Sequence, residues 1–262
     1  MIDNTLTHDF DIRVKGDSVI YRKHSPSPKV RVPCRRARRP RSTRNLILFL
    51  ATNSGGTNQL ALDRECAAIE SELRMSPNRE DFELCSKWAV SVDEMARHLM
   101  QLQPTIIHFS GHGICSERVR SRPSSRDRDV GIAACSNGGI YLKNEHGGPQ
   151  IVPARALTMM IRSAAASARV VVLNACYSDA QACELCTAVD CVVGMAGVIH
   201  DDDARSFSVG FYRARGNRRS VGNALDHAVA TLAAKQLADE HVPRLRTRDG
   251  VDARQVVLTS AT

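Results

Sequence analysis

Aromatic residues and long apolar runs are both scarce in this chain of 262 residues. Only 4% of the residues are aromatic, whereas 43% are hydrophobic and 24% are charged, a composition that fits an aliphatic globular protein and excludes a disordered, collagenous or coiled-coil chain. No segment approaches the roughly 18 consecutive apolar residues of a membrane helix, and the first thirty residues lack the pattern of a secretion signal. We therefore expect a cytoplasmic protein with no membrane partner.

The signatures of several ligand classes are missing as well. The chain has neither a G-x-x-x-x-G-K-[ST] phosphate loop nor a G-x-G-x-x-G fingerprint. Its nine cysteines have no regular spacing, so they predict reduced thiols rather than a disulfide framework. Cys183 and Cys186 form a C-x-x-C pair, but no second pair nearby completes four zinc ligands. The sequence therefore predicts neither a metal site nor a cofactor.

The net charge of +8 is concentrated at the N-terminus. Residues 1–44 hold 12 Lys and Arg against 4 Asp and Glu, whereas residues 45–262 hold 24 of each. The arginines of this stretch alternate with prolines, which predicts a flexible basic arm over 1–44 and one domain over 45–262. The arm is either a solvated linker or a segment that binds phosphate or an acidic partner. No aromatic residues are interleaved with its arginines, which disfavours single-stranded nucleic acid.

From residue 45 onward, short aliphatic runs alternate with amphipathic stretches, as in an α/β protein with a mostly parallel sheet. Residues 115–137 are rich in arginine and serine and predict an exposed loop. The predicted strands are 46–51, 82–90, 105–109, 139–142, 169–174, 191–195 and 255–258, and the predicted helices are 60–73, 92–102 with Ser91 as N-cap, 153–163, 179–189, 204–215 and 221–238.

Two of the predicted strands end in residues that carry chemistry. The strand at 105–109 leads into Ser110-Gly111-His112-Gly113, and the strand at 169–174 leads into Ala175-Cys176. Functional groups gather at the carboxyl ends of parallel strands, and a thiol nucleophile needs an imidazole base from a separate loop. The alternative is that Cys176 is a small buried hydrophobe. His108 lies inside its strand, which predicts either a core histidine or one that supports the residues of the site from behind.

The segments 107–113 (IHFSGHG) and 172–178 (VLNACYS) resemble the signature of the CHAT family of bacterial caspase-like proteins, relatives of separases, metacaspases and caspases. The resemblance covers about residues 45–260. It implies a caspase-hemoglobinase-like α/β/α sandwich on a mostly parallel six-stranded sheet and a cysteine endopeptidase with a His/Cys dyad. Cys176 would be the nucleophile, His112 the base, and the backbone N–H groups of Gly113 and Cys176 the oxyanion hole.

The same resemblance points to residues that could bind the substrate. Asn174 precedes the nucleophile by two residues, where several relatives specific for basic residues carry an acid. Asp201, Asp202 and Asp203 follow the next strand, where the family has part of its substrate-recognition loop, and an acid there could pair with a Lys or Arg of the substrate. The alternative is a charged turn or helix N-terminus.

The resemblance also implies partners. We expect a protein substrate, an upstream activating protease or sensor protein, and a role in bacterial defence, stress or cell death. The 115–137 loop is either a segment processed on activation or a tolerated insertion. The alternative function is a catalytically silent interaction module that docks through its basic arm. Nucleic acid is a possible partner only through the arm.

Overall fold

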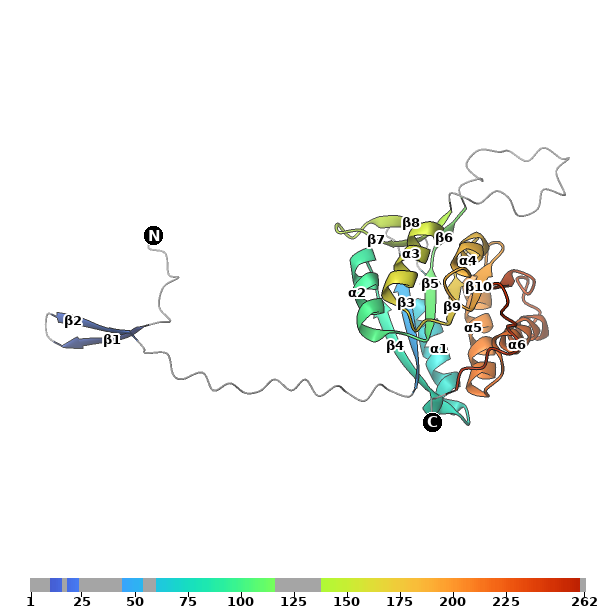
Figure 1. Ribbon diagram of the computed structural model, residues 1–262, viewed down its shortest axis with the longest axis horizontal. Helices are drawn as coiled ribbons and strands as arrows, with labels where there is room; N and C mark the ends of the chain where they lie inside the picture. Colours follow the sequence, from blue (N-terminus) through green and yellow to red (C-terminus); the bar gives the residue numbers. More distant parts are fainter. Residues whose placement is uncertain (1–9, 16–17, 24–43, 54–59, 116–137, 260–262) are drawn as a thin grey trace. The chain divides into compact units, whose positions relative to one another are not determined.

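The computed structural model describes residues 10–15, 18–23, 44–53, 60–115 and 138–259, and the chain divides into two units, 1–41 and 42–262. In the first unit, β1 (Phe10–Lys15) and β2 (Ser18–Lys23) pair antiparallel as a hairpin (Figure 1). The charge pattern of the predicted arm gave no sign of this hairpin. Residues 1–9, 16–17 and 24–43 of the predicted arm lie outside the described residues.

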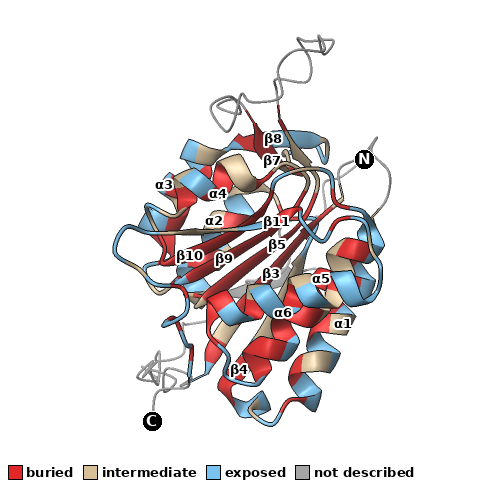
Figure 2. Cartoon of the chain, turned by 90° about the vertical axis from the view of Figure 1, so that its right-hand side faces the viewer, coloured by how far each residue is buried: buried red, intermediate tan, exposed pale blue. Residues whose placement is uncertain are grey.

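A six-stranded sheet forms the centre of the second unit, in the order β11-β10-β9-β5-β3-β4 (Figures 1 and 2). Five strands are parallel, and β11 runs antiparallel to β10. This arrangement confirms the predicted α/β class and the mostly parallel sheet. The strands are β3 (Asn45–Thr52), β4 (Phe82–Trp88), β5 (Ile106–Gly111), β9 (Val170–Asn174), β10 (Cys191–Met195) and β11 (Pro243–Thr247).

Helices cover both faces of this sheet (Figure 1). Three of them pack on one face and three on the other, and each face carries its own cluster of buried apolar side chains. The first face has α1 (Leu62–Met75), α5 (Asp201–Gly216) and α6 (Val221–Ala234), and the second has α2 (Val92–Leu102), α3 (Ala154–Ala164) and α4 (Asp179–Leu185); a single 3-10 turn, η1 (Arg79–Asp81), precedes β4.

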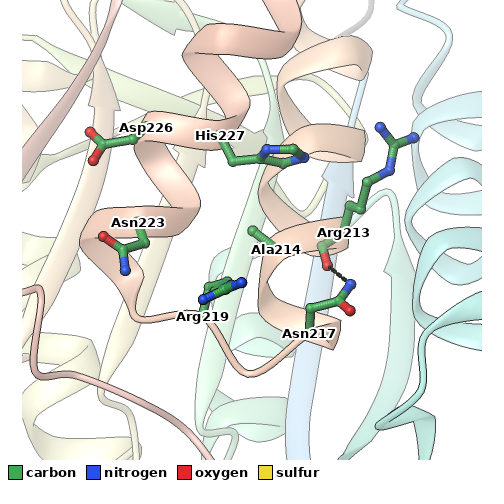
Figure 3. Close-up of a pocket in the computed structure, with 7 residues that line it drawn as sticks. All are labelled: Arg213, Ala214, Asn217, Arg219, Asn223, Asp226 and His227. Carbon is green, nitrogen blue, oxygen red and sulfur yellow. Dashed lines mark hydrogen bonds between the residues drawn. The ribbon is translucent and has the colours of Figure 1, made fainter.

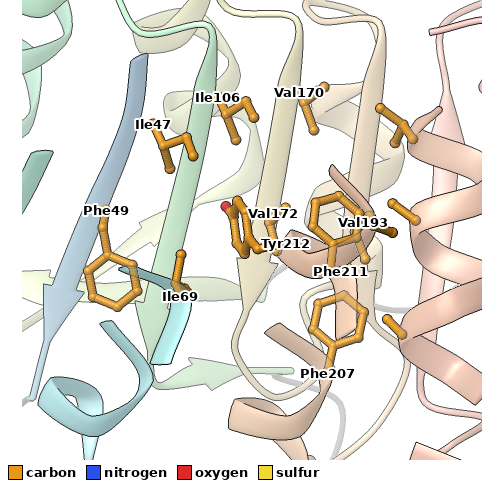
Figure 4. Close-up of a cluster of buried hydrophobic side chains, with 14 of the residues drawn as sticks. Ile47, Phe49, Ile69, Ile106, Val170, Val172, Val193, Phe207, Phe211 and Tyr212 are labelled. Atoms are coloured by element: carbon orange, nitrogen blue, oxygen red, sulfur yellow. The ribbon is translucent and has the colours of Figure 1, made fainter. Parts of the chain in front are cut away.

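The central strands are apolar on both sides because both faces of a parallel sheet are covered. In β3, Ile47 and Phe49 point to the α1/α5/α6 face, and Leu48 and Leu50 point to the other face. All four are fully buried. Figure 4 shows the first of these clusters, where Tyr212 of α5 joins the aliphatic side chains of the sheet.

A second, three-stranded antiparallel sheet follows β5. Its strands are β6 (Gly113–Ile114), β7 (Gly139–Lys143) and β8 (Pro149–Pro153). The sequence predicted only the middle strand. The 115–137 loop was expected between the first two, and residues 116–137 lie outside the described residues.

The C-terminal part differs from the prediction. Residues 255–258 form no strand: Val256 and Leu258 are buried against the first core cluster, and their apolar character reflects burial rather than pairing. The last strand is instead β11, whose arginines suit the exposed edge of a sheet. Two helices are shorter than predicted: α4 ends at Leu185 and α6 at Ala234. A third helix, α5, is longer, since it begins at Asp201 rather than at residue 204.

Among the cysteines that the structure describes, one differs from the prediction. Six of the cysteines in the described ranges carry free thiols, as expected, but Cys115 forms a disulfide bond. Irregular spacing argues against a disulfide framework and does not exclude a single bond. Among the described residues, no helix combines the length and the apolar character that a membrane span requires.

Candidate active site

His112 and Cys176 lie just beyond the carboxyl ends of two adjacent strands. In the parallel pair of β5 and β9, Ser110 is level with Asn174, so continuing this register by two residues brings His112 level with Cys176. Side chains alternate along a strand. Since Ser110 and Asn174 face α1 and α5, His112 and Cys176 belong to that same side of the sheet.

Gly113 holds the two strand ends in close contact. A Cβ atom at this position would lie 2.3 Å from the carbonyl oxygen of Cys176 and 3.3 Å from Cβ of Ala175. No side chain other than hydrogen fits such an approach. The spacing of His112 and Cys176 therefore depends on a glycine between them.

The backbone N–H of Gly113 points away from β7. Tyr141 N–H donates to the carbonyl of His112 at 3.0 Å, and Gly113 is opposite Ile140 in the next position of the ladder. Hydrogen-bonded and non-bonded pairs alternate in an antiparallel ladder, so the Gly113 N–H is not directed at β7. Within the described ranges the Cys176 N–H donates no hydrogen bond.

Both residues line one small pocket, of about 40 Å³, at this edge of the sheet. Asn174, Asp201 and Glu65 line it as well, so the structure brings together four of the predicted site residues and one that was not predicted. The remaining wall consists of Leu60, Ala61, Leu62, Ser110, Gly111, Ile199 and Ala204. A volume of this size holds a few water molecules but no large side chain.

The sulfur of Cys176 contacts the backbone of the segment that follows β10. Ile199 N–H donates a hydrogen bond to Sγ at 3.5 Å, and the thiol donates one to the carbonyl oxygen of Ile199 at 3.7 Å. The neighbouring Tyr177 N–H donates to Gly197 O at 2.9 Å. Residues 197–199 are therefore attached to the Cys176 turn at two points.

Beneath the pocket lies a buried carboxylate, Glu65 of α1, which is 4% exposed. Its Oε1 accepts hydrogen bonds from His108 Nε2 at 3.0 Å, Asn174 Nδ2 at 2.6 Å and Ser208 Oγ at 2.6 Å. Its Oε2 accepts one from Ser110 Oγ. One side chain thus ties β5, β9 and α5 together under the candidate nucleophile.

The electrostatics of this carboxylate follow from its partners. Burial raises the pKa of Glu65, but the hydrogen bonds from His108, Ser110 and Ser208 outweigh burial and hold the pKa below its usual value. His108 Nδ1 lies 3.0 Å from the hydroxyl of Tyr212. Burial and the nearby Glu65 charge raise the pKa of Tyr212, so this phenol stays protonated.

Sequence reasoning missed Glu65, although a signal was present. The predicted helix 60–73 has an apolar face formed by Leu62, Cys66, Ile69 and Leu73, and Glu65 lies on it at helical spacing. The polar residues His108 and Ser110 inside an otherwise apolar strand are the matching signal. An acid on a buried helix face and polar residues in a buried strand together indicate a hydrogen-bonded pair.

The acidic run 201–203 divides between two environments in the first turn of α5. Asp201 lines the pocket, and its carboxylate accepts a hydrogen bond from Ala61 N–H at 3.2 Å. Asp203 does not line the pocket; it is buried and accepts from Asp239 N–H at 3.1 Å. Burial raises the pKa of Asp203.

Residue 200 is anchored next to this turn. Asp239 Oδ2 accepts both the backbone N–H and the Nδ1 of His200, each at 2.9 Å. The hydrogen bond to Asp239 raises the pKa of His200. The side-chain atoms of His200, Asp203 and Asp239 that could bind a metal ion lie within 4.8 Å of one another. The hydrogen bonds of Asp239 with His200 and Asp203 account for this grouping.

A larger hollow of about 600 Å³ lies elsewhere, between the C-terminal end of α5 and the start of α6 (Figure 3). Its charged residues are exposed, and two of them form ion pairs: Arg213 with Glu72 at 2.8 Å and Asp226 with Arg254 at 2.9 Å. None of the predicted site residues lines it.

The chain matches a family model and is similar to a solved structure. The sequence matches the CHAT domain over residues 20–245, a range that begins inside the predicted arm. No curated protein matches it. Among solved structures, the chain is similar to the Drosophila initiator caspase Dronc, with 8% sequence identity and a TM-score of 0.49 over 83% of this chain and 86% of that one.

Proposed function

The chain belongs to the CHAT-domain family, and we propose that it is a caspase-like cysteine endopeptidase in which Cys176 is the nucleophile and His112 the general base. The observation that carries this proposal is the convergence of the two side chains on one pocket at adjacent strand ends. A silent interaction module has no need of this pair. The role in bacterial defence, stress or cell death, and the cytoplasmic location, rest on the family resemblance and on the sequence.

The reaction follows from the chemistry of the two groups. His112 takes the proton of the Cys176 thiol, and the thiolate adds to the carbonyl carbon of the scissile amide. The resulting tetrahedral intermediate collapses when His112 returns the proton to the amide nitrogen, which leaves as an amine, and a thioester remains on Cys176. Water, deprotonated by His112, then adds to the thioester and releases the acid and the free thiol.

The oxyanion needs two aligned donors, each of which is worth about 10²–10³ in kcat in other enzymes. We assign these donors to the backbone N–H groups of Gly113 and Cys176. The orientation of the Gly113 N–H away from β7 and the close approach of Gly113 to Cys176 support this assignment. Both donors are backbone groups, which cost little reorganisation during the reaction.

Asn174 and Asp201 are the residues that we propose for recognition of the substrate side chain. The Oδ1 atom of Asn174 is buried and has no hydrogen-bond partner among the described residues, and the residue lines the pocket, which supports a role for this amide as a hydrogen-bond acceptor for the substrate. Asp201 adds a negative charge at the rim. Together they favour a basic side chain before the scissile bond, whereas the buried position of Asp203 favours a structural role for that carboxylate.

The small size of the pocket supports control of activity by a partner or by proteolysis. Its volume of about 40 Å³ is less than that of a Lys or Arg side chain, and the backbone of Ile199 contacts the sulfur that must attack the substrate. Both observations favour a movement of residues 197–199 when the substrate binds. We propose that an activating protein or cleavage in the 115–137 loop releases this segment.

The test is cleavage of a peptide library by the full chain, before and after limited proteolysis, with mass spectrometric mapping of the products. The proposal predicts cleavage after Lys or Arg that is abolished in Cys176→Ala and reduced at least a hundredfold in His112→Ala. Cys183→Ala, which changes an exposed thiol outside the pocket, is the matched control and keeps full activity. Cleavage that survives Cys176→Ala, or a protein inactive in every form, contradicts it.

A further inference from the structure

The single tryptophan of the chain lies at the carboxyl end of β4, close to the candidate active site. Trp88 is 49% exposed although it is a large aromatic residue. Its ring packs against Phe49 at a centroid distance of 6.0 Å, so part of the indole is fixed and the rest is open. Directly after it, Ala89 has a φ of 57° and its N–H donates to Ala51 O at 2.7 Å, which ends the strand.

The exposed indole is part of the wall of a second pocket, of about 290 Å³. Leu60, Leu62 and Ala89 supply further apolar surface, and Asp63 and Lys143 line it as well. Leu60 and Leu62 also line the pocket of His112 and Cys176. The two pockets are therefore neighbours that share one wall, and only the Trp88 pocket has room for a large side chain.

The sheet order determines on which side of the scissile bond this pocket lies. Cys176 follows β9, His112 follows β5, and Trp88 ends β4, with β3 between the last two. The base must reach the nitrogen of the leaving amine, so the half of the substrate that leaves as the amine lies on the His112 side of Cys176. The Trp88 pocket lies further along in this same direction.

The strand spacing gives the position along the peptide. Neighbouring strands lie about 4.8 Å apart, so β4 is roughly 10 Å from β5. An extended peptide advances about 3.3 Å per residue. Cys176 follows β9, one strand further away, so the Trp88 pocket lies about 14 Å from the scissile bond, and a side chain three or four residues after that bond is at the right distance.

We propose that the Trp88 pocket is a subsite for a bulky apolar side chain of the substrate, three or four residues after the scissile bond. This inference rests on the proposed peptidase function and adds a specificity-determining residue to it. An apolar side chain fits because the pocket offers an aromatic face and two leucines, and because Asp63 and Lys143 offset one another as charges. Removing such a contact surface lowers discrimination by about tenfold or more.

The experiment uses two kinds of substrate and the full chain. One substrate carries a small fluorogenic amine directly after the scissile bond, and the others carry four residues there, with Leu or Gly at each position in turn. Trp88→Ala is compared with Trp88→Phe, which keeps an aromatic face, and with Met100→Ala, a control at an exposed apolar residue of α2 that is 60% exposed.

The inference predicts that wild type prefers Leu over Gly at position three or four by about tenfold in kcat/KM. Trp88→Ala removes this preference and leaves the fluorogenic substrate unaffected within twofold, whereas Trp88→Phe retains most of the preference and Met100→Ala all of it. Cleavage without any preference at these positions, or a preference that survives Trp88→Ala, overturns the subsite and leaves the peptidase intact. If neither kind of substrate is cleaved in a way that depends on Cys176, both the subsite and the proposed peptidase function are overturned.

Discussion

The glycine between the two strand ends gives the sharpest prediction for activity. In Gly113→Ala the new Cβ atom would lie 2.3 Å from the carbonyl oxygen of Cys176, whereas ordinary contacts begin at 3.4 Å. The backbone of the His112 or Cys176 segment must therefore move by about 1 Å. A misplacement of about 1 Å costs roughly a hundredfold in rate, so we expect a loss of about two orders of magnitude in kcat/KM.

The assay compares this variant with a glycine outside the pocket and outside the 197–199 segment. A Cβ atom at Gly148, in the turn between β7 and β8, would lie nearest to the amide end of the Asn144 side chain, at 3.2 Å, which can shift, so Gly148→Ala should stay within a few-fold of wild type. Overpacking at Gly113 should also lower the free energy of unfolding by about 1–3 kcal/mol, which thermal unfolding measures separately. A Gly113→Ala enzyme within threefold of wild-type activity refutes the reasoning.

The remaining predictions concern the stability of the fold. Glu65→Gln replaces a carboxylate that accepts four hydrogen bonds and should lower the free energy of unfolding in urea by about 2–4 kcal/mol; a loss below about 0.5 kcal/mol would contradict the network. Because the pKa of Glu65 is lowered in the folded state, its contribution is present above the unfolded value of 4.5 and is lost as the pH falls through the folded pKa. Wild type should therefore lose stability more steeply in acid than Glu65→Gln, and parallel pH profiles would exclude this assignment. Ser91→Ala removes the capping box of α2 and should cost about 1 kcal/mol, whereas Ser163→Ala on an exposed face of α3 should be neutral; equal effects would contradict the capping argument.

Much of the sheet could be predicted because its strands are apolar on both faces. The runs around 46–51, 105–109 and 169–174 correspond to β3, β5 and β9, in which every residue except Leu46 is buried, and parallel strands carry this pattern whatever their neighbours are. The Ser91 cap was confirmed for a similar reason, since a capping box depends only on residues three positions apart. The meeting of His112 and Cys176 at one pocket followed from the strand ends.

Features that depend on partners distant in the sequence could not be predicted in this way. β11 has an arginine at every second position and forms a strand because it pairs with the edge of β10. The apolar residues Val256 and Leu258, in contrast, are buried without pairing as a strand. The contact between Ile199 and the sulfur of Cys176 joins two loops and has no local pattern. Glu65 lies between these cases, because its place on an apolar helix face and the polar residues His108 and Ser110 in an apolar strand are visible in the sequence, whereas their pairing is not.

The most direct test of the central claim is covalent labelling of the purified full chain by peptidyl electrophiles that carry Arg, Lys, Asp or Leu at the residue before the reactive group, measured by intact mass. We expect one label per chain on wild type, strongest with Arg or Lys, no label on Cys176→Ala and slow labelling of His112→Ala, with limited proteolysis increasing the rate in wild type. Labelling that persists in Cys176→Ala, or no labelling of wild type in either form, would contradict the assignment of Cys176 and His112 as a catalytic pair.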